Sequence, residues 1–565
     1  MGWEGAGCGG GGGVVMGVRV VCVAQEGKGV GTGHRVRMER LAEGLRKEGV
    51  EAGVRVWDGG RWEGEGGEVV WVVDVRRSER GWVRALKEEG VVVALDPDPV
   101  LAREADVVLA GLPQAHRERV NVRVAPVWWE VPRREGRGRE IRRVLVSFGG
   151  EDPWGLTEWV CGLDGGVWGG CEVEVVVGPR FGREVRTGWR VVRPSGPLHE
   201  RLGDYDLVIT SFGLTAYEAR KAGVGVLLLN PTAYHAGLGR RAGFAGGRPG
   251  RGWVRLLGRV LRGGEEGVWG EGVGGRSAVE VVRGVVEGWG GVGCPGCGER
   301  GRRAVWRGEE RTVVRCAGCG LEYVLGLGPA EREYGPDYFF EEYRAQYGRT
   351  YLEDFASIVE RGRERVQVLR RWVPEGGRVL DVGCAYGPFL VAAREGGYVP
   401  AGLDVGEDAV AYVRQELGVW AWVGRFEEWE EEGEWDALTM WFVIEHFRRL
   451  SEVLDKVARL LKKGGMFAFG TPNARGLSWL LRRDRFYRES PRDHHLLLSV
   501  GVVRRLLGRW GMKVVAVRQT GLHPERIPVL GRLFPPGTLR WRITGRLLGL
   551  LGLGDTIEIY AKKYG

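Results

Sequence analysis

A short glycine-containing segment in the second half of the chain constrains the fold more than any other feature. Residues 378–390, RVLDVGCAYGPFL, have the pattern of a buried strand, a sharp turn and the start of a helix. Glycine lets the backbone turn sharply and approach a ligand closely. Asp381, Gly383 and Gly387 give D-x-G-x-x-x-G, whereas a dinucleotide site more typically shows G-x-G-x-x-G. The segment therefore predicts a ligand-binding strand, loop and helix that differ from those of a nicotinamide dehydrogenase.

The residues that follow continue to alternate between strands and helices. A second strand over 401–405 contains Asp404, whose carboxylate is able to accept both hydroxyls of a ribose. Further elements are expected in this order: a fourth strand over 436–442, then Ile444, Glu445 and His446, an amphipathic helix over 453–461, a turn over 463–465, a fifth strand over 466–470 and a closing strand over 556–561. This order predicts one mainly parallel sheet with helices between its strands.

These motifs resemble those of the class I (Rossmann-like) S-adenosylmethionine-dependent methyltransferases, over roughly residues 370–565. The resemblance implies that Asp381, Gly383 and Gly387 border the methionine end of the cofactor. It also implies that Asp404 holds the ribose and that residues 425–427 lie beside the adenine. The sulfonium of this cofactor is already activated. The protein therefore has to align an acceptor for in-line attack and, for some acceptors, remove a proton.

His446 is the candidate general base for that proton. It lies just past the fourth strand, at the edge of the sheet where acceptors bind. The alternative is a histidine that only caps or packs. His494 and His495 form a second candidate pair, in a segment that resembles the H-x-x-x-F-S element of the same enzymes, although loop packing is the favoured interpretation for them.

Two pairs of cysteines precede this region. Cys294, Cys297, Cys316 and Cys319 give C-x2-C, 18 residues and C-x2-C, a spacing that places four thiolates tetrahedrally around one Zn²⁺. Gly298 and Gly320 follow the pairs, where a tight knuckle needs a positive φ. With every position taken by protein, the metal would be structural; a redox dithiol pair is the alternative. The pairs and the residues after them resemble the zinc ribbon that precedes methyltransferases of polysaccharide gene clusters.

Residues 17–290 alternate strands and helices in two sets, which predicts two parallel-sheet lobes, over 17–140 and 141–290. Three motifs follow strands of these lobes: Gly31-x-Gly33-His34-x-x-Arg37, Ser147-Phe-Gly-Gly-Glu-Asp-Pro153 and Ser211-Phe-Gly-Leu-Thr-Ala-Tyr-Glu218. The third motif opens a helix with small and hydroxyl residues, which suits a diphosphate. Glu218, in the first turns of that helix, is able to accept ribose hydroxyls.

The three motifs resemble those of the UDP-sugar hydrolases of pseudaminic-acid biosynthesis and their spore-coat polysaccharide relatives, over about 18–288. The resemblance implies a two-lobed glycosyltransferase-B fold in which His34 activates water at the anomeric carbon. Residues implied to contact the nucleotide sugar are Gly33, Arg37, Gly213, Thr215 and Glu218.

The chain also departs from that family. Leu214 stands where a second glycine is usual, Asp74-Val-Arg replaces Asp-x-Tyr, and the family's Asn-Gln is replaced near Tyr234 and His235. Residues 237–275 are rich in Gly and Arg and poorly patterned. The alternative is therefore a pair of lobes that binds a nucleotide sugar without converting it.

Charge and composition bound the partners and the location. The 83 basic and 74 acidic residues give a net charge of +9, spread without a concentrated basic stripe, so no nucleic-acid partner is expected. The sequence contains no apolar run long enough to predict a transmembrane helix. The Gly-rich start over 1–16 lacks the pattern of a secretory signal and is expected to be disordered. The five cysteines outside the two pairs are scattered, as in a reduced, cytoplasmic protein.

The sequence thus predicts an α/β chain with a two-lobed front half, a zinc ribbon over 291–325, a helical linker over 326–369 and a methyltransferase domain over 370–565. The predicted function is a fused carbohydrate-modifying enzyme. Its front half binds a UDP-sugar or related nucleotide sugar and hydrolyses it or transfers from it, and its rear half methylates a sugar or glycan-related acceptor. One alternative is an RNA methyltransferase with a zinc module and a degenerate nucleotide-binding front domain. Another is a scaffold whose front half only presents sugar nucleotides.

Overall fold

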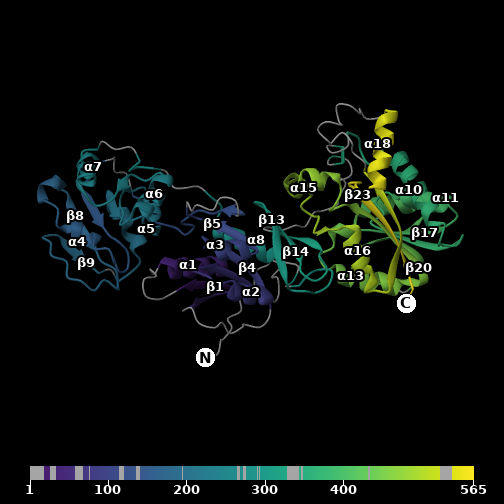
Figure 1. The fold of residues 1–565 in the computed structure, drawn as a ribbon, viewed down its shortest axis with the longest axis horizontal. Coiled ribbons are helices and arrows are strands. Elements are labelled where there is room, and N and C mark those ends of the chain that lie inside the picture. The colour runs from purple at the N-terminus through teal and green to yellow at the C-terminus, as the bar shows by residue number, and fades with distance from the viewer. Residues whose placement is uncertain are drawn as a thin grey trace, which may run out of the picture. The chain divides into compact units, whose positions relative to one another are not determined.

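The computed structural model describes residues 18–564 except for several segments. These segments are 26–32, 58–67, 76, 113–119, 135–139, 194, 264–266, 271–274, 289–290, 292, 327–340, 342, 345–347, 431–432 and 522–537. The start expected to be disordered and much of the predicted linker lie outside the described residues. The chain divides into two compact units (Figure 1): one over Met1–Glu287 with Arg307–Glu310, and one over Gly288–Trp306 with Arg311–Gly565.

The first lobe of unit 1 is a parallel sheet of six strands, in the order β2-β1-β3-β4-β5-β6. Its elements are β1 (Val18–Gln25), α1 (Gly33–Lys47), β2 (Ala52–Trp57), β3 (Glu68–Asp74), α2 (Arg80–Glu89), β4 (Gly90–Leu95), α3 (Pro99–Glu104), β5 (Val107–Ala110) and β6 (Val122–Arg123). Strands β1, β3 and β4 are runs of Val and other apolar residues that are almost wholly buried. Such runs are typical of strands covered on both faces.

The second lobe is another parallel sheet of six strands, in the order β12-β11-β10-β7-β8-β9. Its elements are β7 (Arg143–Val146), α4 (Leu156–Cys161), η2 (Gly165–Trp168), β8 (Glu172–Val176), β9 (Arg190–Val192), η3 (Leu198–Asp204), β10 (Leu207–Thr210), α5 (Leu214–Lys221), β11 (Gly225–Leu229), α6 (Ala233–Arg241), β12 (Gly246–Gly247) and α7 (Arg251–Leu261). The region over 237–275, which is poorly patterned in the sequence, thus contains part of α6 and the whole of β12 and α7. One face of α7 is buried, and it consists of Trp253, Leu257 and Val260.

After the second lobe the chain returns to the first. Helix α8 (Ala278–Glu287) packs against α1. Val279 lies so close to Gly44 of α1 that a Cβ added to Gly44 would be 2.6 Å from Cγ2 of Val279. Arg283 pairs with Glu48 at 2.6 Å on the same side. The last helix of the front half therefore belongs to the core of the first lobe.

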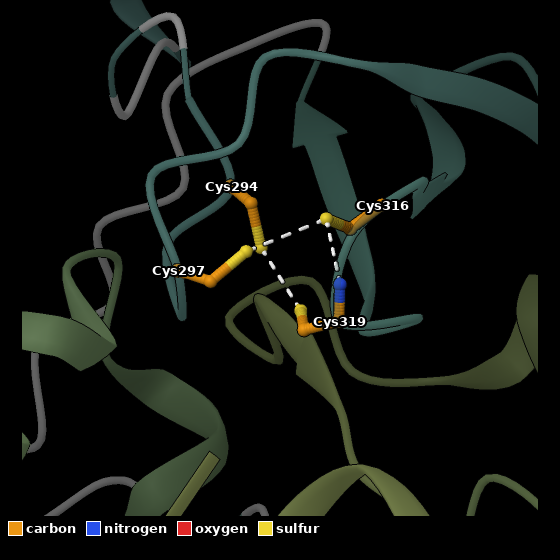
Figure 2. A group of neighbouring side chains, drawn as sticks. All are labelled: Cys294, Cys297, Cys316 and Cys319. Carbon is orange, nitrogen blue, oxygen red and sulfur yellow. Dashed lines mark hydrogen bonds between the residues drawn. The ribbon is translucent and has the colours of Figure 1, made fainter. Parts of the chain in front are cut away.

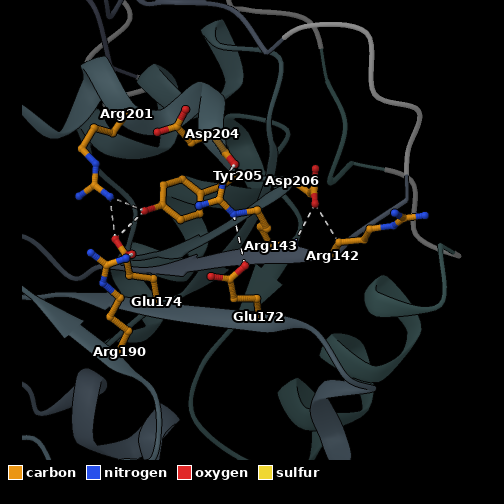
Figure 3. A network of polar contacts seen from close by, with 9 residues as sticks. All are labelled: Arg142, Arg143, Glu172, Glu174, Arg190, Arg201, Asp204, Tyr205 and Asp206. Carbon is orange, nitrogen blue, oxygen red and sulfur yellow. Dashed lines mark hydrogen bonds and ion pairs between the residues drawn. The ribbon is translucent and has the colours of Figure 1, made fainter.

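A network of ion pairs fixes one edge of the second sheet (Figure 3). Asp206, just before β10, accepts the backbone N–H groups of Arg142 and Arg143 at the start of β7, each at 2.8 Å. Tyr205 donates its hydroxyl to Glu174 at 2.6 Å. These residues lie at or near the amino ends of their strands, while the Ser147 and Ser211 motifs follow the carboxyl ends. One edge of the sheet is thus tied together, and the opposite edge carries the loops.

Unit 2 begins with a small sheet, and the four paired cysteines lie before it and at the turn between two of its strands. Strands β13 (Arg302–Arg307), β14 (Arg311–Cys316) and β15 (Glu322–Gly326) are joined by a fourth strand, β21 (Leu496–Leu497), from far along the chain. β14 and β15 are antiparallel, as are β15 and β21. The ribbon is therefore completed by a strand of the domain that follows it.

That domain is built on a sheet of seven strands, in the order β18-β17-β16-β19-β20-β23-β22. Its elements are α10 (Phe355–Leu369), β16 (Arg378–Val382), α11 (Pro388–Glu395), β17 (Val399–Asp404), α12 (Glu407–Gln415), β18 (Trp420–Val423), β19 (Trp435–Trp441), η5 (Ile444–His446), α13 (Leu450–Leu460), β20 (Leu461–Pro472), α14 (Leu477–Leu481), α15 (Arg483–Glu489), α16 (Val500–Gly508), β22 (Met512–Thr520), α18 (Leu539–Leu550) and β23 (Thr556–Lys563). None of the helices described is long and apolar enough to cross a membrane.

The predicted strands of this domain are all present, with two differences. The residues expected to form a turn, 463–465, lie within β20, where Gly464 has φ +83° and the pairing with β19 shifts register. The expected closing strand, β23, runs antiparallel between β20 and β22. It is therefore not at the edge, which is formed by the unpredicted strand β22. The neighbouring strands β16, β19 and β20 are buried on both faces, so the loops at their carboxyl ends are held in fixed positions.

Candidate functional site

The predicted cofactor loop follows β16 and enters α11. Gly383 has φ +71°, and a Cβ there would lie 2.3 Å from Cγ2 of Val443. Gly387 has φ +81° at the N-cap of α11, and a Cβ there would lie 2.6 Å from Leu417. Both positions combine a left-handed backbone with no room for a side chain, so only glycine fits without strain. The loop is thus a close-packed cradle beside the end of β19.

Two buried carboxylates lie under this loop. Asp404, at the end of β17, accepts the backbone N–H groups of Ala385 and Gly406 at 2.8 and 2.9 Å, and burial raises its pKa. A carboxylate has about four acceptor positions, so these two bonds still leave room for ribose hydroxyls. Asp381 accepts the Thr439 hydroxyl at 2.6 Å, and burial raises its pKa to about 7. Both carboxylates lie against the loop, and their contacts with the methionine end and the ribose of the cofactor remain predictions.

The residues predicted to lie by the adenine follow β18. Phe426 is buried in the core, while Arg425 and Glu427 are exposed. Their contact with the adenine remains a prediction.

The acceptor side is built from the end of β19 and the loop before β21. His446, in η5, has its Nδ1 at 3.1 Å from the backbone oxygen of Asp493 and at 3.4 Å from its carboxylate. The rings of His446 and His494 meet edge to face, 4.8 Å apart. The backbone N–H of His495 donates to the oxygen of Glu445 at 2.8 Å. The predicted base and the second histidine pair, which are far apart in sequence, thus form one cluster.

The protonation of this cluster depends on burial and on two acidic groups. Burial lowers the pKa of His446, but Asp493 and Glu445 outweigh it, and the pKa lies above its usual value. Burial lowers the pKa of His494 to about 3 and that of His495 to about 4. His494 and His495 are therefore neutral near pH 7 and present their ring nitrogens as acceptors or ligands.

Glu445 is the unusual member of the cluster. Its side chain is 0% exposed, and burial raises its pKa to about 6. Neither carboxylate oxygen has a hydrogen-bond partner of ordinary geometry, although the nearby Thr471 hydroxyl lowers the pKa slightly. No role was predicted for Glu445 or Asp493 from the sequence. The only sequence signal for them is that each directly precedes a candidate histidine.

The four paired cysteines converge on one point (Figure 2). The Sγ atoms of Cys294 and Cys319 are 3.6 Å apart, as are those of Cys297 and Cys316. Gly298 and Gly320 have φ +74° and +76°, which confirms the predicted knuckle geometry. A disulfide would bring two sulfurs to about 2.05 Å, whereas four thiolates about 2.3 Å from one Zn²⁺ lie about 3.8 Å apart. The arrangement thus fits a tetrahedral metal centre.

In the first lobe, His34 and Arg37 lie one turn apart on α1 and share a partner. His34 Nδ1 is 2.6 Å from Asp74 at the end of β3. Arg37, 4% exposed, lies 3.1 Å from the other oxygen of Asp74 and 2.8 Å from Asp96. Gly33 begins the helix directly before His34. Asp74 is a site residue whose role the sequence did not indicate, since it was noted only as a departure from the family.

In the second lobe, Gly213 is the N-cap of α5, with no side chain capping the first amides. Thr215 is half-buried in the first turn. Glu218 is 7% exposed, and burial raises its pKa to about 7, while Trp129 acts in the opposite sense. Within the Ser147 motif, Asp152 accepts the backbone N–H groups of Leu156 and Thr157 and so caps α4. The ligand contacts expected of these residues remain predictions.

The C-terminal region is similar to known proteins. The family model described as "Methyltransferase domain" matches residues 352–517. Ubiquinone biosynthesis O-methyltransferases of Escherichia coli O9:H4 and Escherichia fergusonii are each 32% identical over 174 residues, covering 28% of this chain and 71% of theirs. A SAM-dependent methyltransferase structure from Archaeoglobus fulgidus is similar over 40% of this chain and 100% of its own, at 18% identity and a TM-score of 0.30.

The family match begins at residue 352, so it includes neither the two lobes nor the cysteine ribbon. It does include the glycine loop, Asp404, Glu445 and His446. Through this region the chain belongs to the methyltransferase family, and the region is a class I S-adenosylmethionine-dependent methyltransferase domain.

Proposed function

We propose that the C-terminal domain transfers a methyl group from S-adenosylmethionine to an oxygen of a sugar or glycan-related acceptor. The observation that carries the proposal is the contact between the cofactor loop and the acceptor side. Gly383 lies against Val443, and the backbone N–H of His446 donates to the oxygen of Val443 at 3.0 Å. A methyl donor held by the loop therefore lies next to the histidine cluster. The names of the O-methyltransferase relatives support an oxygen acceptor.

Each group of the site has a role in this proposal. S-adenosylmethionine supplies the methyl group on an activated sulfonium. Gly383 and Gly387 let the backbone approach the methionine end, Asp381 lies beneath it, and Asp404 holds the ribose. His446, with Asp493 behind its Nδ1, brings about the loss of the acceptor's proton. Alignment and proton removal are all that such a reaction requires of the protein.

We propose further that Cys294, Cys297, Cys316 and Cys319 hold a structural Zn²⁺. The sulfur separations of 3.6 Å support a tetrahedral thiolate site. The backbone oxygen of Cys319 accepts Arg505 of α16 at 2.9 Å, so the centre is attached to the methyltransferase domain. The four cysteines fill every coordination position, which leaves the metal no place for substrate.

For the front half we propose a glycosyltransferase-B-like pair of lobes that binds and hydrolyses a UDP-sugar. Asp74 engages His34 Nδ1 and thereby leaves Nε2 as the nitrogen that takes a proton from water. Gly33 and Arg37 lie beside that histidine. Gly213, Thr215 and Glu218 would hold the diphosphate and the ribose at the N-terminus of α5. Cleavage of the anomeric C–O bond by water would release UDP and the free sugar.

Two measurements test the proposal. Calorimetric titrations of the full chain with S-adenosylmethionine and with UDP should show one independent site for each. Labelled S-adenosylmethionine should then transfer its methyl group to nucleotide sugars or glycans, with total RNA as the comparison. Transfer to RNA would contradict the carbohydrate acceptor and favour the RNA methyltransferase. A lack of UDP binding would contradict the role given to the front half.

A further inference from the structure

The acceptor side of the methyltransferase domain contains a set of side chains typical of metal ligands. One ligand atom each from Glu445, His446 and His494 lies within 4.8 Å of the other two. Glu445 and His446 belong to η5 at the end of β19, and His494 belongs to the loop before β21. Two imidazoles and one carboxylate form a ligand set that suits divalent cations such as Mn²⁺, Fe²⁺, Co²⁺ and Zn²⁺.

Glu445 supplies an independent observation. A carboxylate that is 0% exposed and has no hydrogen-bond partner of ordinary geometry at either oxygen is stabilised when a cation lies beside it. Among the described residues no arginine or lysine forms an ion pair with Glu445. The Thr471 hydroxyl beside it likewise has no partner of ordinary geometry. The buried oxygens of this cluster thus point to a positively charged ligand.

The histidines are arranged as metal ligands commonly are. Asp493 engages Nδ1 of His446 through both its backbone oxygen and its carboxylate, which directs Nε2 away from it. A histidine ligand is usually oriented in this way, with its other nitrogen held by a carboxylate or a backbone oxygen. The ring of His494 stands perpendicular to that of His446. Both rings can therefore present a nitrogen to one point beside Glu445.

We propose that Glu445, His446 and His494 bind a divalent cation to which the acceptor coordinates. This inference rests on the proposed function for the position of the acceptor, and it specifies how His446 acts. Three protein ligands leave about three positions of an octahedral ion for water and acceptor. Two neighbouring oxygens of a sugar diol would fill two of them, so the preferred acceptor is a chelating diol.

The cation would make the acceptor hydroxyl reactive near neutral pH. Coordination to a divalent ion lowers the pKa of a bound hydroxyl, so its proton leaves to water. The oxygen lone pair then forms the new C–O bond as the bond between the methyl carbon and sulfur breaks, and that electron pair stays on sulfur. The products are a methyl ether, S-adenosylhomocysteine and one proton.

Mn²⁺ is the probe, because it favours oxygen and nitrogen ligands over the thiolates of the ribbon. The full chain, with Zn²⁺ in its cysteine site, is treated with EDTA, desalted and titrated with Mn²⁺, with free Mn²⁺ followed by electron paramagnetic resonance. We expect one bound Mn²⁺ per chain, with pulsed spectra that show coupling to histidine ¹⁴N. Failure of the unmodified protein to bind Mn²⁺, or binding without nitrogen coupling, would overturn the inference.

Variants locate the site. Glu445→Gln, which keeps the size of the side chain, and His494→Ala should each weaken Mn²⁺ binding by about tenfold or more. His495→Ala is the matched control, because His495 is the next residue and lies outside the ligand set; it should keep the affinity. Titration with S-adenosylmethionine verifies that each variant is folded. Unchanged Mn²⁺ affinity in both ligand variants would contradict the assignment.

The metal and the proposed acceptor can fail separately. If Mn²⁺ binds as expected but no sugar hydroxyl is methylated, the proposed function is wrong and the metal site stands. If a sugar acceptor is methylated at full rate in EDTA by protein that binds no Mn²⁺, the metal site is wrong and the proposed function stands.

Discussion

Two histidines in this chain, one in each unit, are held in a similar way. His34 and His446 each follow the carboxyl end of a parallel strand, and each has Nδ1 engaged by an aspartate, Asp74 or Asp493. The charge around them differs. Beside His34, Arg37 pairs with both Asp74 and Asp96. Beside His446, Glu445 is buried and pairs with no arginine or lysine of the described chain.

The buried carboxylates beside His34 have a cation partner, whereas the buried carboxylate of Glu445 has no arginine or lysine partner among the described residues. Asp96 also accepts the backbone N–H groups of Gly111 and Leu112, each at 2.9 Å. The carboxylates of the network around His34 are therefore paired within the protein itself, although Arg37 Nε and Nη2 and Asp74 Oδ2 lack a hydrogen bond of ordinary geometry. The stability of this network should therefore not depend on a ligand. The cluster around His446 retains buried charge that a ligand would neutralise. Two histidines that each have Nδ1 beside an aspartate thus lead to opposite expectations for the stability of the protein when a neighbouring charge is removed.

Removing Arg37 should have the largest effect. Arg37→Met keeps much of the side chain's length but leaves Asp74 and Asp96 buried without their cation. Breaking a buried ion pair in this way costs about 3–5 kcal/mol. Calorimetric unfolding should show a large loss for the transition of unit 1 and little change for that of unit 2. A loss within about 0.5 kcal/mol of zero would contradict the view that Arg37 stabilises the two buried carboxylates.

Replacing each histidine should separate the two activities. We expect His446→Ala to lower the rate of methyl transfer by about 10²- to 10³-fold, in the range of a lost proton-handling group. His34→Ala should lower UDP release from a UDP-sugar by a similar factor and leave methyl transfer unchanged. Each variant serves as the control for the other. UDP release that persists unchanged in His34→Ala would leave the front half as a binding module.

A buried carboxylate in the second lobe tests the effect of pH. The pKa of Glu218 is about 7 in the folded protein, against 4.5 for an ordinary glutamate. The folded state thus keeps a proton that the unfolded chain releases, and stability is lost as the pH rises from about 4.5 to about 7. The full shift corresponds to about 3 kcal/mol.

Glu218→Gln should remove this dependence on pH. Denaturant unfolding should show similar stability for the two proteins at pH 5, and a more stable variant at pH 8. Parallel loss of stability in both proteins between these pH values would show that another group is responsible.

The smallest effect should be opposite in sign to that of Arg37→Met. Glu445→Gln replaces a buried, unpaired carboxylate by a neutral amide of the same size. In protein freed of metal we expect it to stabilise unit 2 by about 1–2 kcal/mol, as measured by thermal unfolding. Added Mn²⁺ should stabilise the unmodified protein and not the variant. Destabilisation by Glu445→Gln in EDTA would mean that Glu445 has a partner within the protein.

Much of the fold could be predicted because its signals are local. The Val-rich strands β1, β3 and β4 and the glycine loop after β16 are recognisable from neighbouring residues alone. The edge strands β2, β18 and β22 were missed; all three are partly exposed, so they lack a strong apolar pattern. Helix α7 was missed because Gly and Arg obscure an apolar face of only a few residues.

A site residue could be predicted only where it belongs to a recognisable sequence motif. Asp404 and His446 belong to spaced patterns, whereas Asp74 and Asp493 acquire a role through contacts with residues 40 and 47 positions away. The isolation of Glu445 was also beyond the sequence, because it depends on which cations the fold places elsewhere. The tertiary structure decides which charged side chains have a partner and which do not.

The sharing of strand β21 has a consequence for how this protein could be divided. Val324 of β15 donates its N–H to His495 at 2.9 Å, and Tyr487 donates to Glu322 at 2.6 Å. A fragment starting at residue 352 would leave an open sheet edge and an uncovered apolar surface beside the histidine loop. The ribbon and the methyltransferase domain are therefore not interchangeable modules, and recombination between them would disrupt the acceptor side first.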